Sequence, residues 1–489
     1  MANAEQGPIR FILDGERVSV GDLPPTTTVL EFLRERLGRT GTKEGCAEGD
    51  CGACTVVLGE LDGEHIIYRA VNSCIRFLPT VDGKELVTVE SLKAADGRLH
   101  PVQQAMVDGH ASQCGFCTPG FVMSLFALYL NESAPDRDSV VRTIAGNLCR
   151  CTGYRPIIEA GLRMNSYPEP RAWNRSAAQG SAKRNALLAI ARKDTLTLAA
   201  GGGFHAPISS DELARLVQQD PDALLLAGGT DVGLWVTKQL RDLPKMIYVG
   251  DVADLKHVQE VGGALDIGAA VSLTDAFAAI VSRYPMLEEM ADRFGSPPVR
   301  NSGTLCGNIA NGSPIGDSMP FLVALGSTVR LRRGDRRREL PLEALYLGYQ
   351  KKALERGEFI EAVRVPLPRA GRLFSSYKVS KRIDQDISAI CGGFAFDVQE
   401  GRIADVRIAY GGMAATVKRA THTEAALAGK PWTHQSIAAA LPRLSQDYAP
   451  ITDMRASREY RMQVARNLLD RFYLEHAAVS AAPYRVAHV

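Results

Sequence analysis

Cysteine is the residue type whose placement in this sequence is best suited to chemistry. The chain has ten cysteines, and eight of them precede residue 152 in two tight groups. The first group is Cys46-x4-Cys51-x2-Cys54, followed by Cys74. Clustered thiolates bind soft metal ions, and this spacing is typical of plant-type [2Fe–2S] sites. A structural zinc site of four cysteines is the alternative, but a zinc ribbon usually pairs one CxxC with another, so the spacing favours iron–sulfur.

Glycines surround this first group in the segment GCAEGDCGAC. Gly45, Gly49 and Gly52 permit positive φ values and let the backbone approach a small anionic cluster. The loop can then donate backbone N–H groups to the sulfur atoms. The glycine pattern therefore also favours a cluster over zinc.

The second group consists of Cys114-x2-Cys117 and Cys149-x1-Cys151. Each pair stands at the boundary of a predicted helix, where a helix N-terminus favours an anionic thiolate. By itself this spacing fits either zinc or a second cluster. The neighbouring first group favours a second [2Fe–2S] cluster.

Two glycine-rich segments follow residue 200, LLLAGGTDVG at 224–233 and RNSGTLCGNIANGSPIGDS at 300–318. Such loops offer backbone N–H groups and small hydroxyls to phosphate oxygens. Neither contains GxGxxG at the start of a helix, so a Rossmann site is not supported. Taken alone, each segment could equally serve only as a turn of the fold.

Three cysteine motifs together resemble the two [2Fe–2S] domains of the xanthine dehydrogenase family of molybdenum hydroxylases. They are GTKEGCAEGDCGACTVVL at 41–58, QCGFCTPG at 113–120 and GNLCRCTGYRPI at 146–157. In that family the first domain is a β-grasp ferredoxin and the second a helical bundle. The metal ligands that the resemblance implies are Cys46, Cys51, Cys54, Cys74, Cys114, Cys117, Cys149 and Cys151.

The glycine-rich segments resemble the flavin domain of the same family, which has the vanillyl-alcohol-oxidase type of fold. The resemblance implies two FAD loops, a residue near the FAD ribose at Asp317, and contacts to the ring systems from Phe294, Ile360 and Lys378. It implies no catalytic residue in this chain. The FAD-binding residues implied are Leu225, Leu226, Ala227, Gly228, Gly229, Thr230, Asp231, Val232, Phe294, Thr304, Leu305, Cys306, Gly307, Asn308, Asp317, Ile360 and Lys378.

The elements that must position the cysteines can be predicted from local patterns. Asp14-Gly15 between two short apolar runs predicts a β-hairpin, and Thr28 with Glu31 predicts a capping box for a helix that Gly38 ends. Strands are predicted at 55–58 and 85–90. Helical patterns then run from 101 to 163, with Thr118 as a predicted N-cap.

These patterns predict a multi-domain α+β chain. Residues 166–200 lose periodicity and gain Pro, Ser, Gly and Arg, which is typical of a linker. Mixed α/β patterns follow, and after Phe374 come antiparallel strands and then helices from His434. The predicted division is a plant-type ferredoxin domain at 1–90, a helical [2Fe–2S] domain at 91–165, a linker at 166–200, an FAD-binding domain at 201–373 and a C-terminal flavoprotein domain, again α+β, at 374–489.

A few single residues have competing interpretations. The run RRGDRRR at 332–338 is more typical of a solvated hairpin turn than of a nucleic-acid patch, because Gly334-Asp335 lies in its middle. Cys306 and Cys391 are expected to be small buried side chains. Trp235 and Tyr349 are expected in the core, although the family places an aromatic residue near the nicotinamide pocket where Tyr349 stands.

Composition excludes several classes of partner. The formal net charge of +2 does not favour nucleic acid or an anionic membrane. The N-terminal residues lack a secretory signal pattern, and the apolar stretch 121–130 is about half the ~20 residues needed to span a bilayer. We therefore expect a cytoplasmic protein.

The resemblance implies an electron-transfer subunit with two [2Fe–2S] clusters and FAD, and with NAD as co-substrate. The molybdenum cofactor would lie only in a large partner subunit that oxidises xanthine or hypoxanthine, with two small and two large subunits assembling as a heterotetramer. One alternative is the Fe–S/FAD subunit of a related hydroxylase acting on an aldehyde, an aromatic heterocycle or carbon monoxide. Another is a stand-alone electron-transfer module.

Overall fold

The computed structural model describes residues 7–477, which form two compact units. The first unit runs to Ala253 and also contains Ser272–Thr274 and Gly295–Gly303. The second unit contains Asp254–Val271, Asp275–Phe294 and the chain from Thr304. No helix within residues 7–477 is both long and apolar enough to cross a membrane.

The first unit begins with a five-stranded mixed sheet of order β2-β1-β5-β3-β4, as expected of a β-grasp domain. Asp14 and Gly15 adopt positive φ values of 51° and 93°, which confirms the predicted hairpin. Strand β4 was not predicted, although the turn at Gly63, with φ of 58°, could have indicated it. The strands are β1 (Ile9–Leu13), β2 (Glu16–Val20), β3 (Thr55–Asp62), β4 (His65–Asn72) and β5 (Glu85–Val87).

The helix of this sheet begins as predicted but changes type. Thr28 and Glu31 form the capping box, so α1 (Val29–Glu31) is capped as its sequence requires. The chain then continues as a π-helical turn, η1 (Phe32–Arg36), where a single α-helix had been predicted. Short 3-10 turns η2 (Leu78–Val81) and η3 (Val89–Ser91) complete the domain.

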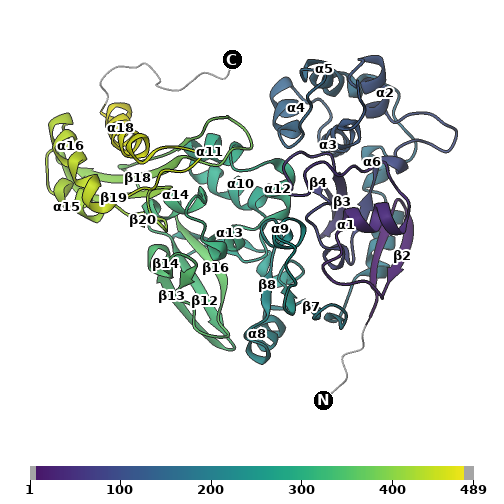
Figure 1. Ribbon diagram of the computed structural model, residues 1–489, viewed down its shortest axis with the longest axis horizontal. Helices are drawn as coiled ribbons and strands as arrows, with labels where there is room; N and C mark the ends of the chain where they lie inside the picture. The colour runs from purple at the N-terminus through teal and green to yellow at the C-terminus, as the bar shows by residue number, and fades with distance from the viewer. Residues whose placement is uncertain (1–6, 478–489) are drawn as a thin grey trace. The chain divides into compact units, whose positions relative to one another are not determined.

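A helical bundle follows, seen as the blue helices α2 to α5 in Figure 1. Its central helix α3 buries nearly its whole surface, including Phe121 and Phe126, and packs on β3 and β4. Cys117, and not the predicted Thr118, occupies its N-cap position. The elements are α2 (Pro101–Asp108), α3 (Thr118–Asn131), α4 (Arg137–Ile144), α5 (Arg155–Arg163) and the 3-10 turn η4 (Met164–Ser166).

The segment predicted as a linker, 166–200, is structured and packed. It contains α6 (Arg175–Ala178) and α7 (Ser181–Ile190), and it buries Trp173 and Leu187 in the hydrophobic core of the helical bundle. The side chain of Gln179 pairs with both the N–H and the C=O of Ile66 on the edge strand β4. Sequence periodicity missed these helices because each is short and is held by long-range contacts.

The first unit ends with a four-stranded sheet of order β6-β7-β9-β8, in which β9 is parallel to both of its neighbours. The sheet begins a few residues before the predicted boundary at 201. Its elements, with the helices of this part of the unit, are β6 (Leu196–Leu198), β7 (Phe204–Ala206), β8 (Leu224–Leu226), β9 (Met246–Tyr248), α8 (Ser210–Gln219), α9 (Val232–Thr237) and α12 (Pro297–Ser302).

The second unit contains a five-stranded antiparallel sheet of order β10-β11-β16-β12-β13. Its strands are β10 (Val258–Val261), β11 (Ala264–Gly268), β12 (Thr328–Arg333), β13 (Arg336–Pro341) and β16 (Phe359–Pro366). Further elements in this part of the chain are η5 (Ala253–Leu255), α10 (Leu273–Arg283), η6 (Pro285–Leu287), α11 (Glu288–Asp292), α13 (Leu305–Asn311), α14 (Ser318–Leu325), η7 (Leu342–Leu345), β14 (Tyr346–Gly348) and β15 (Lys351–Lys352).

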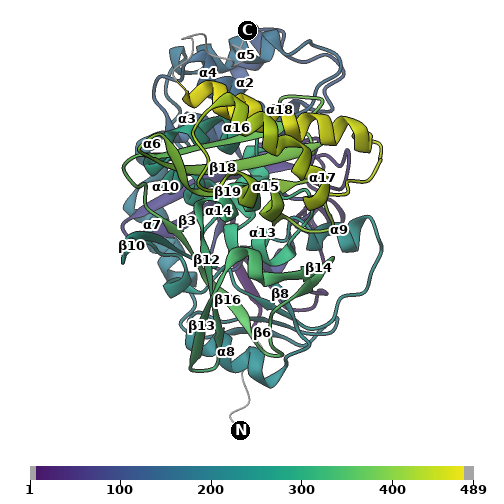
Figure 2. The same cartoon turned by 90° about the vertical axis from the view of Figure 1, so that its left-hand side faces the viewer.

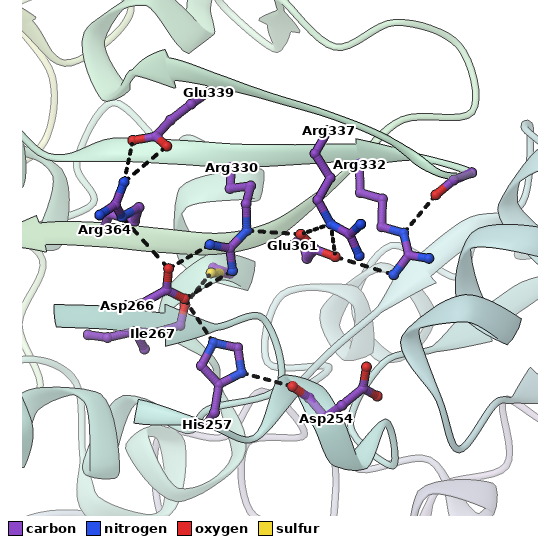
Figure 3. Close-up of polar contacts among 12 residues, drawn as sticks. Asp254, His257, Asp266, Ile267, Arg330, Arg332, Arg337, Glu339, Glu361 and Arg364 are labelled. Carbon is purple, nitrogen blue, oxygen red and sulfur yellow. Dashed lines mark hydrogen bonds and ion pairs between the residues drawn. The ribbon is translucent and has the colours of Figure 1, made fainter. Parts of the chain in front are cut away.

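The arginine-rich run forms the predicted β12–β13 hairpin, but it is less solvated than expected (Figure 3). Glu361 accepts hydrogen bonds from Arg330 and Arg337 and forms an ion pair with the buried Arg332. Asp266 accepts hydrogen bonds from Arg330 and His257. Burial opposes ionisation of Asp266, but these bonds outweigh it and lower the pKa of the carboxyl. The arginines are therefore paired within the fold, which does not favour a nucleic-acid patch.

The C-terminal part of the second unit is a four-stranded antiparallel sheet with helices on both faces (Figure 2). Phe394 and Phe396 of β18 pack on Phe472 of α18, while Gly393, just before Phe394, faces the backbone of Pro320 and Phe321 in α14. Successive side chains of β18 thus point to opposite faces of the sheet, and helices cover both faces. The elements are β17 (Arg372–Val379), β18 (Ile390–Gln399), β19 (Arg402–Gly411), β20 (Lys418–Arg419), α15 (Thr421–Leu427), α16 (His434–Ala440), η8 (Leu441–Arg443), α17 (Leu444–Asp447) and α18 (Arg458–His476).

Candidate cofactor sites

The four thiols of the first cysteine group converge in space. The Cys46 thiol is within hydrogen-bonding reach of Cys51 and Cys74, and Cys74 also reaches Cys54. The hydrogen bonds with Cys51 and Cys74 lower the pKa of Cys46 far below its ordinary value. Cys54 and Cys74 are both 2% exposed, so the pair is closed to solvent.

This donor set fits a two-iron cluster. A [2Fe–2S] cluster takes four thiolates, two on each iron, and the four converging thiols supply that set.

The backbone of the loop turns toward the same sulfur atoms. The N–H groups of Glu48 and Cys51 each donate to Cys46 Sγ at 3.4 Å. A Cβ on Gly45 would lie 2.8 Å from Cys51 Sγ, and Gly49 has a φ of 82°. These glycines are required by close approach and by positive φ, as the sequence predicted.

The second cysteine group converges in two pairs. Cys114 lies within hydrogen-bonding reach of Cys151, and Cys117 of Cys149. Burial, with a smaller contribution from Cys149, raises the pKa of Cys117 to about 12. Cys114 and Cys151 are exposed, in contrast to the closed pair of the first group.

Side chains next to the second group support its backbone. The N–H of Cys149 donates to the hydroxyl of Tyr154 at 3.0 Å, and Thr152 Oγ1 lies 3.2 Å from Cys149 Sγ. Tyr154 has a φ of 66°, which is uncommon for a residue other than glycine. Local sequence patterns gave no signal for this strained residue.

The two cysteine loops contact each other directly. The N–H of Leu148 donates to the carbonyl of Cys51 at 3.0 Å, and the Asn147 amide donates to the carbonyl of Gly52, also at 3.0 Å. The buried Asn147 also accepts a hydrogen bond from Ser124. Sequence analysis missed Asn147, although its position two residues before Cys149 in GNLCRC could have marked it.

The first glycine-rich segment follows β8 at the carboxyl end of a parallel pair of strands. This is the usual position of ligand-binding loops in sheets with parallel strands. A Cβ on Gly228 would collide with the backbone of Ser302 and Gly303, which belong to the second segment. Gly228 is thus required by backbone packing.

Helix α9, at the end of this segment, packs against the first cysteine loop. A Cβ on Gly233 would lie 2.8 Å from Ile75 Cβ, and Leu234 packs on a small cluster that contains Ile75, Cys54 and Cys74. The hydroxyl of Thr237 donates to the carbonyl of Ala47 at 2.7 Å. Sequence analysis did not find these contacts, since their partners are more than 150 residues away.

The second unit holds the remaining flavin candidates, Thr304–Asn308, Asp317, Phe294, Ile360 and Lys378. Lys378 Nζ donates to Asp317 Oδ2 at 2.6 Å in a buried ion pair. Asp317 Oδ1 is buried without a hydrogen-bond partner in the described chain. An unpartnered acceptor of this kind fits a ligand hydroxyl such as one on a ribose.

Of the other residues that the sequence singled out, Phe294, Ile360, Cys306 and Cys391 are buried, whereas Trp235 and Tyr349 are not. Phe294 is 9% exposed and packs on Phe277, and Ile360 on β16 is 6% exposed. Cys306 and Cys391 are buried, as predicted. Trp235 is half-buried beneath Arg241, whereas Tyr349 is 64% exposed, so the prediction that Tyr349 belongs to the core is wrong.

Four families match consecutive segments of the chain. Residues 11–78 match the 2Fe-2S iron-sulfur cluster binding domain, and residues 88–162 match the [2Fe-2S] binding domain. Residues 198–368 match the FAD binding domain in molybdopterin dehydrogenase. Residues 375–476 match the CO dehydrogenase flavoprotein C-terminal domain.

Individual proteins are also similar. Xanthine dehydrogenase of Emericella nidulans is 31% identical over 95% of this chain and 38% of its own length. Aldehyde oxidase 1 of Bos taurus is 28% identical over 95% of this chain and 39% of its own. Among solved structures, a chain of carbon monoxide dehydrogenase from Hydrogenophaga pseudoflava is 29% identical with a TM-score of 0.52, covering 55% of this chain and 94% of that one.

The domains define an iron–sulfur flavoprotein, with two [2Fe–2S] domains followed by an FAD-binding domain. The chain belongs to the molybdenum hydroxylase family of oxidoreductases, as an Fe–S/FAD chain of that family. It spans less than half the length of the curated relatives reported above.

Proposed function

We propose that the eight clustered cysteines hold two [2Fe–2S] clusters, with Cys46, Cys51, Cys54 and Cys74 around the first and Cys114, Cys117, Cys149 and Cys151 around the second. The converging thiols, the N–H groups directed at Cys46 and the glycines that leave room beside Cys51 support this assignment. When bound, the clusters supply one-electron chemistry and FAD supplies two-electron chemistry.

FAD is assigned to the two glycine-rich loops and to buried residues of the second unit. Leu225–Val232 and Thr304–Asn308 present backbone N–H groups to the phosphates. Asp317 accepts from a ribose hydroxyl through its unpartnered Oδ1 while Lys378 holds its other oxygen. Phe294 and Ile360 supply apolar contact to the ring systems.

Electron transfer between a partner and NAD is the function that this arrangement supports best. The observation that carries it is a continuous series of contacts in the first unit. The second cysteine loop bonds to the first through Leu148 and Asn147, and the first loop bonds to α9 of the flavin loop through Ala47. These contacts link the residues that would hold the two clusters and the first flavin loop, and Cys54 and Cys74 in the middle of the series are buried.

The partner is a large subunit that carries the molybdenum cofactor and oxidises xanthine or hypoxanthine, with NAD⁺ as the terminal acceptor. Several curated relatives of full length bear the name xanthine dehydrogenase, and this chain corresponds to somewhat over a third of that of Emericella nidulans. We propose a heterotetramer of two small and two large subunits. A cytoplasmic location suits it, because a reducing compartment keeps the eight cysteines out of disulfides and available as cluster ligands.

A related hydroxylase is the second candidate. The 28% identity to an aldehyde oxidase supports it, as does the fold shared with a chain of carbon monoxide dehydrogenase. The substrate pocket would lie in the partner, so this chain does not distinguish these substrates. The third candidate, a stand-alone electron-transfer module, predicts that no molybdenum-bearing chain copurifies.

The experiment measures two reactions, each with and without the large subunit. NADH-to-dye activity needs only residues of this chain and is expected in both samples. Xanthine-to-NAD⁺ activity is expected only with the large subunit. Xanthine turnover by this chain alone would contradict the relay, and a flavin-replete chain without NADH-to-dye activity would contradict the nicotinamide site. Aldehyde turnover without xanthine turnover in the complex would support the second candidate.

A further inference from the structure

One peptide of the first cysteine loop links the flavin side of the molecule to a cluster ligand. This peptide joins Ala47 to Glu48, and no peptide bond within residues 7–477 is cis. In a trans peptide the C=O and the N–H point in opposite directions. Here the carbonyl of Ala47 accepts a hydrogen bond from Thr237 Oγ1, and the N–H of Glu48 donates to Cys46 Sγ.

The conformation of Ala47 is unusual and needs support. Its φ is 54°, a left-handed value that is unfavourable for a residue with a Cβ. The Thr237 bond is 2.7 Å long, whereas the other acceptor of that hydroxyl, the carbonyl of Gly233, lies at 3.1 Å. The shorter bond therefore goes to the cluster loop and opposes rotation of the strained peptide.

We propose that Thr237 is a positioning residue that fixes the Ala47–Glu48 peptide and thereby sets the reduction potential of the first cluster from the flavin side. Hydrogen bonds to ligand sulfur stabilise the more negative, reduced form of a cluster and raise its potential. A hydrogen bond to a peptide carbonyl also polarises the N–H of that peptide, which strengthens the N–H to Sγ bond. The proposal rests on the assignment of Cys46 as a ligand.

The helix that carries Thr237 is itself held in place. Gly233 lets α9 approach Ile75, and Leu234 packs on the small group of buried side chains that includes Cys54 and Cys74. Replacing one hydroxyl should therefore leave the helix in position. Thr237→Val removes the hydroxyl at nearly constant volume, Thr237→Ser keeps it, and Thr237→Ala is a second variant that adds no bulk.

The test is a reductive titration of the purified, cofactor-loaded chain, followed by the paramagnetic signals of the two clusters. Variants that remove one ligand from each loop assign the signals. In Thr237→Val we expect the first cluster to be harder to reduce by about threefold in equilibrium constant, or about 28 mV at 59 mV per tenfold for one electron. Thr237→Ser should match the unmodified chain, and the second cluster should not shift in any variant.

An unchanged first-cluster potential and signal in Thr237→Val and Thr237→Ala, with normal flavin content and thermal stability, would overturn the proposal. An equal shift of both clusters would also overturn it, since that indicates a global change. An unmodified chain that lacks two iron–sulfur signals would instead reject the proposed function, so the two failures are distinguishable.

Discussion

The two cysteine groups have four thiols each but differ in what surrounds them. Cys54 and Cys74 of the first group are buried, and its loop at 46–54 is enclosed by the helical bundle and by α9. Cys114 and Cys151 of the second loop are exposed, and the loop also exposes Phe116 and Leu148, which are 47% and 42% exposed. A buried site of this kind must keep its loop in one conformation, whereas an exposed site can tolerate local change. Substitutions in the buried group should therefore affect the stability of the whole unit, whereas substitutions in the exposed group should affect only that site.

The strongest test removes one ligand from each loop. Cys54→Ser should abolish the first cluster signal and also lower the thermal stability of the unit, because a ligand within the core is lost. Cys114→Ser should abolish the second signal and leave the stability of the β-grasp domain nearly unchanged. Iron analysis should show a loss of half the bound iron in each variant. Retention of both signals in either variant would reject the ligand assignment.

A pair of glycines provides the next comparison. Gly52 in the first loop and Gly115 in the second have φ values of 68° and 85°. A Cβ on Gly52 would meet the carbonyl of Gly146 and the side chain of Asn147, whereas a Cβ on Gly115 would meet nothing within 4 Å.

We therefore expect Gly115→Ala to cost only the strain of positive φ, about 1–2 kcal/mol. Gly52→Ala adds a clash between the loops and should cost about 3 kcal/mol or more. Thermal unfolding of the loaded chain measures both variants. Equal losses of stability would show that the contact between the loops contributes nothing beyond backbone strain.

The helical bundle contains a buried histidine, His100, whose protonation makes the stability of the bundle depend on pH. His100 Nδ1 accepts from the N–H of Val102, and its Nε2 lies 3.1 Å from the carbonyl of Trp173, so the neutral ring has both partners it needs. Burial lowers the pKa of His100 to about 4 from its ordinary 6.5. Protonation would place a second donor against the Val102 N–H.

The lowered pKa of His100 determines the direction in which stability changes with pH. Between pH 6.5 and 4 the unfolded chain binds more protons at this residue than the folded chain, so stability falls as pH falls through that window. The loss at pH 4 should be about 3 kcal/mol for the bundle. His100→Gln should flatten the dependence of the unfolding midpoint on pH, while His110→Gln, which changes an exposed histidine, should not. An unaltered dependence in His100→Gln would contradict the prediction.

Local patterns predicted those features that local chemistry determines. The Asp14-Gly15 hairpin and the Thr28–Glu31 capping box formed as expected, because turn geometry and capping depend on residues a few positions apart. The cysteine spacing likewise indicated two groups that the fold does bring together. The π-helical turn after Glu31 was not predicted, and nothing in the local pattern distinguishes it from an α-helical turn.

Contacts between distant segments could not be predicted in the same way. Thr237 lies 190 residues from its partner Ala47, and nothing in VGLWVTKQ distinguishes its hydroxyl from that of any other helical threonine. The packed helices of 166–200 depend on partners such as Ile66 and Glu85, which periodicity does not detect. The arginine-rich hairpin of Figure 3 is the opposite case, because its charged side chains find their partners within the same sheet.

The smallest predicted effect concerns the support of the exposed loop. Tyr154→Phe removes the hydroxyl that accepts the N–H of Cys149 but keeps the ring, which packs edge-on against Phe121. The loss should be about 1 kcal/mol, the usual net value of one hydrogen bond, because nearby solvent can replace the acceptor at an exposed site. The second cluster signal should shift slightly and the first should not. Tyr167→Phe is the matched control, since its hydroxyl bonds to the exposed Asp108 and touches neither loop. If Tyr154→Phe changed the first signal as well, the two loops would be coupled through the Leu148–Cys51 contact, and the second could no longer be treated as locally tolerant.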